Sequence, residues 1–291
     1  MFKLKHAIAW AAVALTGMAH AYVPQGGTWI ISEEANGRPG RGFAIDVQND
    51  VLVMQVYAYE SSGQPTFYMA TGRLDDNSEL TTTLGRYAGG RFLGSDARSG
   101  VESGSPGNVR IRFVSGTLGY ITLPGEGEKE IKRFRFGYDD SPASLLGLWS
   151  LVYGDSNGNI ETETMQLTRI TGGSSFGSGM TVSYDGLFAC EQIIRGVDAG
   201  KTQCVKMRSG TSSETVRGFW FNFSVNQAEG NWNNTRGSGE GALYANRLMQ
   251  NSGRITGLLR KVTPDAGSEQ NSNDDALRAA LEAQASARQS R

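Results

Sequence analysis

Histidine is almost missing from this sequence, because only His6 and His20 occur among its 291 residues. Both lie within residues 1–21, a segment that we expect to be removed on export. A mature chain without imidazole lacks the base of Ser-His-Asp and Cys-His catalytic sites, the usual zinc ligand and the commonest general base. The absence argues against these enzyme classes and favours a non-catalytic protein.

Residues 1–21 have the pattern of a secretory signal peptide. Lys3 and Lys5 give a basic start, an apolar run extends from Ala7 to Met18, and Ala19-His20-Ala21 fits a small-residue cleavage site. The run is too short to remain in a bilayer as a span, and no later run approaches the length of a transmembrane helix. We therefore expect cleavage before Tyr22 and a soluble, periplasmic or secreted protein that is not membrane-spanning.

An excess of charge of one sign is also lacking. The chain has 28 Lys and Arg residues against 29 Asp and Glu residues, for a formal net charge of −1. Loss of Lys3 and Lys5 with the signal leaves 26 basic against 29 acidic residues, a net charge of −3. A nearly neutral chain has no electrostatic footprint for nucleic acid. We expect no nucleic-acid partner, and no motif indicates a cofactor or a metal.

Cysteine is limited to Cys190 and Cys204. In an oxidising compartment a single pair is most simply a disulfide, which would close a hairpin around the polar turn at residues 196–202. A closed loop of about 15 residues stabilises a fold by roughly 3 kcal/mol in the chain-entropy treatment. A redox pair or a metal site is the alternative, but the C-x-x-C spacing and a partner ligand are both missing.

Glycine, by contrast, is abundant, with 39 residues, while proline is limited to 7. Together with many Thr, Ser, Tyr and Phe residues, this composition favours short strands joined by tight turns. Polar and apolar residues alternate between Phe43 and Tyr59, and the turn-forming Gln48-Asn49-Asp50 interrupts the alternation. A second polar turn follows at Ser61–Pro65. The segment is therefore predicted to form an antiparallel meander.

The tripeptide Gly-x-Trp begins at Gly27 and again at Gly147, directly after the polar, turn-forming stretch 139–146. We place a domain boundary there. The expected fold class is all-β, with two antiparallel meander or barrel-like units at residues 22–138 and 147–263. The repeated tripeptide makes the second unit a candidate duplication of the first, which a shared strand order would support.

The last segment, residues 264–291, has a different composition. It begins with a polar linker and continues as an Ala-rich stretch in which Leu277 and Leu281 are four residues apart. So narrow an apolar stripe predicts a disordered or weakly helical tail, with disorder favoured.

The first unit carries an ordered series of aromatic and turn motifs. They are Gly-x-Trp at Gly27, Gly40-x-Gly42-Phe43, Tyr57-x-Tyr59 and Gly63-Gln64-Pro65-Thr66-Phe67-Tyr68. The series resembles a repeat of exported, mostly uncharacterised proteobacterial proteins, which usually reads G-x-W, G-x-G-F, W-Y-x-Y, G-x-P-x-W-Y. The resemblance extends over residues 27–136 and departs from the pattern at Val56 and Phe67, which replace Trp. It implies an exported β protein and no particular activity.

Trp29 and Trp149 also resemble, more weakly, the first-strand Gly-x-Trp of lipocalins and avidins. The resemblance implies that each ring closes one end of a barrel and that a basic side chain from a late strand covers it by a cation-π contact. The candidates are Arg133 or Arg135 in the first unit and Arg254 or Arg260 in the second. A tryptophan in a ligand pocket is the alternative, and barrel closure is favoured.

Aromatic and amide residues concentrate in two stretches of the second unit. Phe219, Phe221 and Phe223 alternate with Trp220 and Asn222, so the phenylalanines are expected to face the core. Trp232 follows within an Asn-rich stretch. Aromatic rings beside amides stack on sugars or close a pocket, and Trp220, Asn222 and Trp232 are possible binding residues if the two rings are exposed and adjacent.

Acidic residues give two further hypotheses. The stretch Asp155–Glu161 has oxygen ligands at alternate positions, but its glycine does not fit a calcium loop, and Asn157-Gly158 indicates a hairpin turn instead. The pairs Glu33/Glu34 and Asp139/Asp140 would suit glycoside hydrolysis. Neighbours on a strand point to opposite faces, however, so neither pair forms a site alone.

These observations favour an exported, soluble, non-catalytic binding or cell-envelope interaction protein whose partner is a small molecule, a glycan or an envelope protein. A carboxylate-only hydrolase acting on cell-wall or polysaccharide substrates is the alternative; it requires two acids about 5–10 Å apart in a cleft. A structural subunit that docks through its tail from Asp265 is a third hypothesis.

Overall fold

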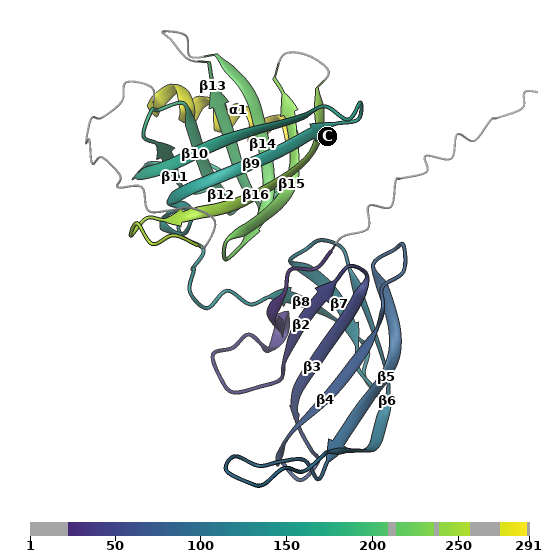
Figure 1. The fold of residues 1–291 in the computed structure, drawn as a ribbon. Helices are drawn as coiled ribbons and strands as arrows, with labels where there is room; N and C mark the ends of the chain where they lie inside the picture. The colour runs from purple at the N-terminus through teal and green to yellow at the C-terminus, as the bar shows by residue number, and fades with distance from the viewer. Residues whose placement is uncertain (1–22, 209–213, 236–238, 257–273, 290–291) are drawn as a thin grey trace, which may run out of the picture.

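The structure is a computed structural model that describes residues 23–208, 214–235, 239–256 and 274–289 (Figure 1). The described residues form two closed antiparallel β-barrels of eight strands each and one C-terminal α-helix. The all-β fold with two barrel-like units and a short helical tail is therefore confirmed. The predicted signal peptide, residues 1–21, lies outside the described residues.

The first barrel follows the chain as an up-and-down meander. Its strands are β1 (Gly27–Ile31), β2 (Gly42–Gln48), β3 (Val51–Tyr59), β4 (Pro65–Arg73), β5 (Glu79–Ala88), β6 (Val101–Phe113), β7 (Leu118–Thr122) and β8 (Glu128–Arg133). A short 3-10 helix, η1 (Ser32–Glu34), follows β1. Each strand pairs with its sequence neighbour, and β1 pairs with β8 to close the barrel.

The second barrel has the same strand order. Its strands are β9 (Gly147–Asp155), β10 (Ile160–Thr171), β11 (Gly177–Ser183), β12 (Phe188–Ile193), β13 (Thr202–Met207), β14 (Thr215–Ser224), β15 (Gln227–Asn234) and β16 (Glu240–Gln250). The 3-10 helix η2 (Pro142–Leu145) precedes β9, which pairs with both β10 and β16. The shared order agrees with the predicted duplication.

Period-two alternation explains why these strands close around apolar interiors. On β3, Leu52, Met54 and Val56 are buried, whereas Val53 and Tyr57 between and beyond them are exposed. One face of such a strand is therefore buried away from water. Closure of the barrel pairs the edge strands that an open sheet would leave unpaired. An eight-stranded barrel is just wide enough for side chains to fill, and the two sets of inward residues form two separate cores.

The predicted turns join the strands. Asn49 adopts a positive φ of 59° between β2 and β3, and Gly63 adopts 81° between β3 and β4. Asparagine and glycine tolerate this left-handed conformation better than other residues.

The tail forms helix α1 (Asp274–Gln289). Leu277 and Leu281 are completely buried against the outside of the second barrel. The covered side chains of β11, β12 and β13 are Met180, Val182, Ala189, Val205 and Met207. The sequence-based preference for disorder over these residues is wrong, because a narrow leucine stripe is sufficient when a strand surface buries it. This helix, the sole α-helix of the described residues, is not apolar enough to span a membrane.

Candidate functional site

Each barrel contains a buried tryptophan in its first strand. Trp29 is inaccessible to solvent, donates its indole N–H to the Gln25 carbonyl at 3.0 Å and contacts Phe113 edge to face. Trp149 is equally buried and donates to the Leu145 carbonyl at 2.8 Å. Each of these hydrogen bonds joins residues four positions apart in the sequence. Each ring lies near the start of the first strand of its barrel, where the resemblance to lipocalins and avidins implies that it closes one end.

The basic side chains beside these rings differ between the barrels. In the first barrel Arg133 is the register partner of Trp29 on β8, and its guanidinium donates to the carbonyls of Gly26, Thr28 and Phe134. Arg135 lies over the ring of Phe223 in the second barrel, 5.0 Å from its centroid. The described contacts therefore place neither arginine over Trp29.

In the second barrel the covering residue is Arg247, which the sequence analysis did not select. Its guanidinium carbon lies 4.3 Å from the centroid of Trp149, its register partner on β9. Of the predicted candidates, Arg254 is exposed beyond β16, and Arg260 lies outside the described residues. The sequence did contain a signal for Arg247, because this residue continues the period-two series of Leu243 and Ala245, which face the interior of the barrel.

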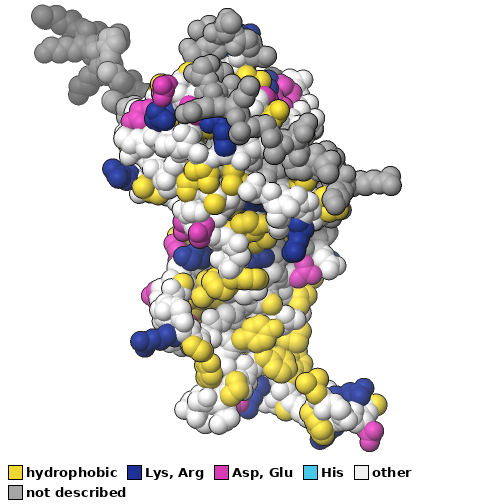
Figure 2. Space-filling view, turned by 90° about the vertical axis from the view of Figure 1, so that its left-hand side faces the viewer, with side chains coloured by type: hydrophobic (Ala, Val, Ile, Leu, Met, Phe, Trp, Pro, Cys, Tyr) yellow, Lys and Arg dark blue, Asp and Glu magenta, His cyan; other side chains and the backbone are white. Residues whose placement is uncertain are grey.

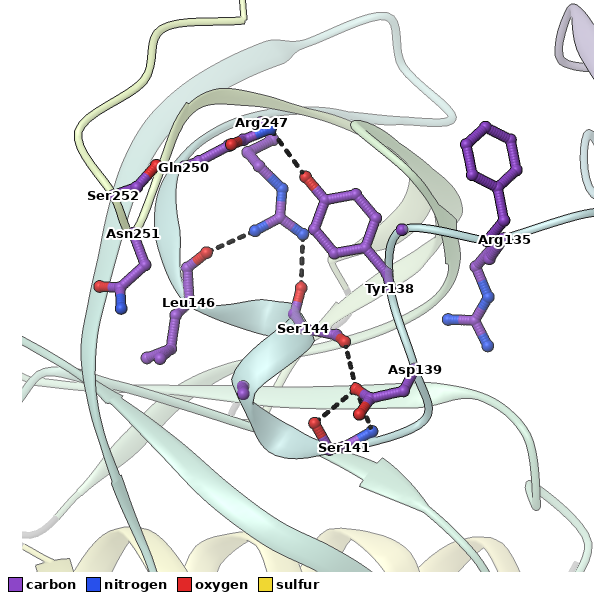
Figure 3. A pocket seen from close by; sticks show the side chains of 13 residues that line it. Arg135, Tyr138, Asp139, Ser141, Ser144, Leu146, Arg247, Gln250, Asn251 and Ser252 are labelled. Atoms are coloured by element: carbon purple, nitrogen blue, oxygen red, sulfur yellow. Dashed lines mark hydrogen bonds between the residues drawn. The ribbon is translucent and has the colours of Figure 1, made fainter.

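A pocket of about 590 Å³ opens beside Arg247 (Figure 3). It lies between the linker that leaves the first barrel and the end of the second barrel that holds Trp149 and Arg247. The lining residues are Arg135, Phe136, Gly137, Tyr138, Asp139, Ser141, Ala143, Ser144 and Leu146 from the linker, and Arg247, Gln250, Asn251 and Ser252 from the end of β16 and the turn after it. We call it the linker pocket.

The guanidinium of Arg247 is fixed in the wall of the linker pocket. It donates to the carbonyls of Ser144 and Leu146, as Figure 3 shows. It also lies over two aromatic rings, 4.7 Å from the centroid of Tyr138 and 4.3 Å from that of Trp149. Its Nε has no partner, and no acidic side chain of the described residues pairs with it. Burial lowers the pKa of Arg247 to about 10, so it remains charged at neutral pH.

Polar groups complete the pocket lining. Asp139 accepts hydrogen bonds from Ser141 and from the Ser144 hydroxyl, which hold the pKa of its carboxyl below the usual range. The Gln250 amide donates to the Tyr138 hydroxyl at 3.2 Å (Figure 3). A fixed cation, a carboxylate, hydroxyls and an amide thus face one cavity, which suits recognition of a small polar molecule.

The possible binding residues of β14 and β15 do not form a joint exposed patch. Trp220 faces outward but is only 8% exposed, because it lies beneath Arg288 of α1, 4.9 Å from its ring. Trp232 faces the barrel interior, is 5% exposed and donates to the Gly154 carbonyl. Asn222 is partly exposed on the outer face. The exposure and adjacency that this hypothesis required are therefore both missing.

The two cysteines form the predicted disulfide. Cys190 and Cys204 are directly opposite each other on β12 and β13, and the bridge lies in the core of the second barrel. The bridge is confirmed. It crosses the middle of the hairpin.

Most of the acidic residues considered from sequence are paired with cations. Glu34 and Glu126 both bind Arg41, and Glu33 binds Lys129. Asp140 binds Arg135. Asp155 accepts the backbone N–H groups of Asn157 and Asn159 in the β9–β10 turn. Within the described residues, no group of three or more His, Cys, Asp or Glu side chains is suited to a metal ion.

A further charged cluster, missed from sequence, lies at the end of β9 remote from Trp149. Glu163 accepts from Tyr153 at 2.7 Å and pairs with Lys206 at 2.6 Å and with Arg217 at 2.7 Å. Arg217 also pairs with Glu161. Burial and the bond to Glu163 raise the pKa of Tyr153 well above its usual value. Glu161 and Glu163 are spaced two residues apart in the same series as the buried Met165, and this spacing was the signal that both acids lie on the inward face of β10.

Comparison with known proteins adds no relative. No protein-family model matches the chain, and neither the curated proteins nor the solved structures contain a significant match.

Proposed function

We propose that the protein is an exported, non-catalytic binding protein that holds a small polar molecule with an acidic group in its linker pocket. The observation that carries the proposal is the guanidinium of Arg247 in the pocket wall, whose Nε has no hydrogen-bond partner and which pairs with no acidic side chain of the described residues. A buried cation is costly unless an anion offsets its desolvation. A carboxylate or a similar anion on a ligand would supply that charge.

The size and position of the linker pocket support the same proposal. Its volume of about 590 Å³ falls in the range of small-molecule sites, which commonly occur between domains. Side chains from the linker and from β16 contribute both donors and acceptors. A sugar acid, or a hydroxy acid of similar size, would match this combination of charge and hydroxyl-binding groups.

The proposal is tested by titrating the purified mature protein with sugar acids, neutral sugars and hydroxy acids in a calorimeter. The pocket is filled by the Ala143→Trp variant, since Ala143 is an exposed residue of its lining. Ala199→Trp, in an exposed turn of the same barrel, is the matched control. We expect an acidic ligand to bind the wild type and Ala199→Trp and to lose affinity at least tenfold in Ala143→Trp. Equal binding to all three, or none by the wild type, would overturn the proposal.

A carboxylate-only hydrolase remains the second candidate because Glu161 and Glu163 lie together at the mouth of the second barrel, both bound to Arg217. This function requires turnover of a cell-wall or polysaccharide substrate by the wild type and its loss in Glu163→Gln. In that case Ala143→Trp would retain activity. This result would distinguish a catalytic site at the barrel mouth from a binding site in the linker pocket.

A further inference from the structure

The loop between β5 and β6 presents two large apolar side chains to water. Phe92 is 71% exposed, and Leu93 is fully exposed. Turns at the surface are usually built from Gly, Pro, Asn, Asp and Ser, so two such side chains side by side are unusual there. We call Phe92 and Leu93 the apolar tip. Figure 1 shows this loop projecting at the end of the first barrel that is remote from the second barrel.

The apolar tip is shaped by a hydrogen-bonded turn. The Ser95 N–H donates to the Phe92 carbonyl at 3.0 Å, and the Arg91 guanidinium donates to the Ser95 carbonyl at 2.6 Å. Gly94 has a φ of 85°, as the third residue of a type II turn requires. Leu93 therefore occupies the outer corner of the turn.

Four exposed aromatic rings lie behind the apolar tip, at the same end of the barrel. They are Tyr57, Tyr59, Phe67 and Tyr87, each 41–54% exposed. Tyr57 and Phe67 are register partners on β3 and β4, and Tyr87 lies near the end of β5, which leads into the loop. We call these four residues the aromatic face. Figure 2 shows apolar side chains gathered over this barrel, the lower one in the view.

The projecting loop also carries basic charge. Arg91 and Arg98 flank the apolar tip, and Asp96 is the one acid between them, so residues 91–98 have a net charge of +1 (two Arg against one Asp). Both arginines are exposed, and neither belongs to an ion pair of the described residues. The next acid in the chain, Glu102, lies behind the tip on β6, opposite Tyr87. The tip itself is therefore apolar and flanked by free cations.

We propose that the first barrel docks on the surface of an anionic lipid bilayer, with the apolar tip inserted below the headgroups and the aromatic face at their level. Charge complementarity selects an anionic lipid, because a guanidinium binds phosphate oxygens through two parallel hydrogen bonds. Tyrosine suits the interface, since its ring is apolar and its hydroxyl is polar. Buried apolar area and attraction to anionic headgroups add in this kind of binding.

The shape of the apolar tip favours a bilayer over another protein or a glycan. A folded partner needs a groove that matches the projecting turn, whereas a fluid bilayer accommodates any apolar side chain that enters it. A glycan stacks on aromatic rings and would leave the aliphatic Leu93 in water. The linker pocket follows β8 at the opposite end of the first barrel, so the inference does not depend on the ligand proposed above.

Binding is tested by cosedimentation of the purified mature protein with vesicles of phosphatidylcholine, alone or mixed with an equal amount of phosphatidylglycerol. We expect binding to the anionic vesicles that salt weakens. The Phe92→Ser/Leu93→Ser variant should lose at least about tenfold in partition constant, because both side chains contribute apolar area. The matched control, Ile194→Ser/Val197→Ser, changes two exposed apolar side chains of the second barrel and should bind as the wild type does.

The charge and the depth of insertion are tested separately. Arg98→Gln should bind the anionic vesicles about fivefold less tightly and leave binding to the neutral vesicles unchanged. Phe92→Trp is mixed with anionic vesicles whose acyl chains carry bromine, which quenches tryptophan fluorescence within the bilayer. The tryptophans of the described residues are at most 8% exposed, so the quenched signal comes from the added ring. Val197→Trp, on the second barrel, should not be quenched.

Quenching of Phe92→Trp without quenching of Val197→Trp would support the proposal even if the double serine variant fails to fold. The proposal would be overturned if the wild type did not bind the anionic vesicles, if the double serine variant bound them equally well, or if both tryptophan variants were quenched alike. Retention on an insoluble glycan, or capture of a protein at the aromatic face, without binding to vesicles would also overturn it.

Discussion

At the scale of single residues, the guanidinium of Arg247 joins the start of β9, the end of β16 and the segment before β9. It satisfies two carbonyls and lies between two aromatic rings, although it is 1% exposed and has no acidic partner. Removing such a group leaves buried acceptors without donors and opens a cavity.

We therefore predict that Arg247→Ala lowers the free energy of unfolding of the second barrel by about 3–5 kcal/mol. Arg254→Ala, which truncates an exposed arginine seven residues later, should change it by less than about 0.5 kcal/mol. Urea denaturation followed by tryptophan fluorescence measures both. Equal stability of the two variants would contradict the structural role of Arg247.

Glu191 is a second buried charge, inaccessible to solvent on the outer face of β12. It accepts hydrogen bonds from the N–H and hydroxyl of Ser174, yet burial dominates and raises the pKa of its carboxyl, with a smaller contribution from Glu282. The folded state therefore binds a proton more readily than the unfolded state. Stability from this group falls as pH rises from its ordinary value of 4.5 through the raised pKa.

The corresponding prediction is that Glu191→Gln flattens the pH dependence of stability above pH 4.5, the ordinary pKa of the carboxyl. The wild type should lose stability relative to the variant as pH rises, whatever constant offset the amide introduces. Glu130→Gln, which removes one exposed charge, controls for net charge. The measurement is the urea midpoint of all three proteins at several pH values, and parallel curves for wild type and Glu191→Gln would refute the assignment.

At the scale of elements, α1 depends on the second barrel. A 16-residue helix with one narrow apolar stripe is marginal in water, and it persists because Leu277, Leu281 and Ala285 are buried on the strands. Its detachment is a local opening that leaves the barrel intact.

We predict that Leu281→Ala lowers the free energy of that opening by about 2–5 kcal/mol. Ser286→Ala, on the exposed side of the same helix, should leave it within about 0.5 kcal/mol. Hydrogen exchange of the α1 amides measures the opening directly. Unchanged protection in Leu281→Ala would show that other contacts hold the helix.

At the scale of the whole molecule, the two barrels behave as separate cores. Among the described strands, none of one barrel pairs with a strand of the other. The described contacts between them include the Gly116 N–H with Glu229, Tyr138 with Asn226, and Arg135 with Phe223. Neither core of the described residues extends across these contacts, so we expect them to couple the units weakly compared with the interior of either barrel.

Calorimetry of the mature protein should therefore show two unfolding transitions. The Cys190→Ala/Cys204→Ala variant should destabilise the second barrel by about 3 kcal/mol, because its closed loop is about 15 residues long, and should leave the transition of the first barrel in place. A single transition that moves as a whole in the variant would mean that the barrels unfold together.

The sequence by itself determined the strands, the turns and the disulfide, because each depends on neighbouring residues: alternation sets the buried face, Asn49 and Gly63 allow the turns, and one pair of cysteines has one way to bond. Only the tertiary structure decided which side chains meet. Arg247 contacts Trp149 because β16 pairs with β9, although the two residues are about 100 positions apart in the sequence. Trp220 is covered by helix α1, and the linker pocket is lined by two segments that are distant in the sequence. Such contacts depend on barrel closure and register, which no local pattern encodes.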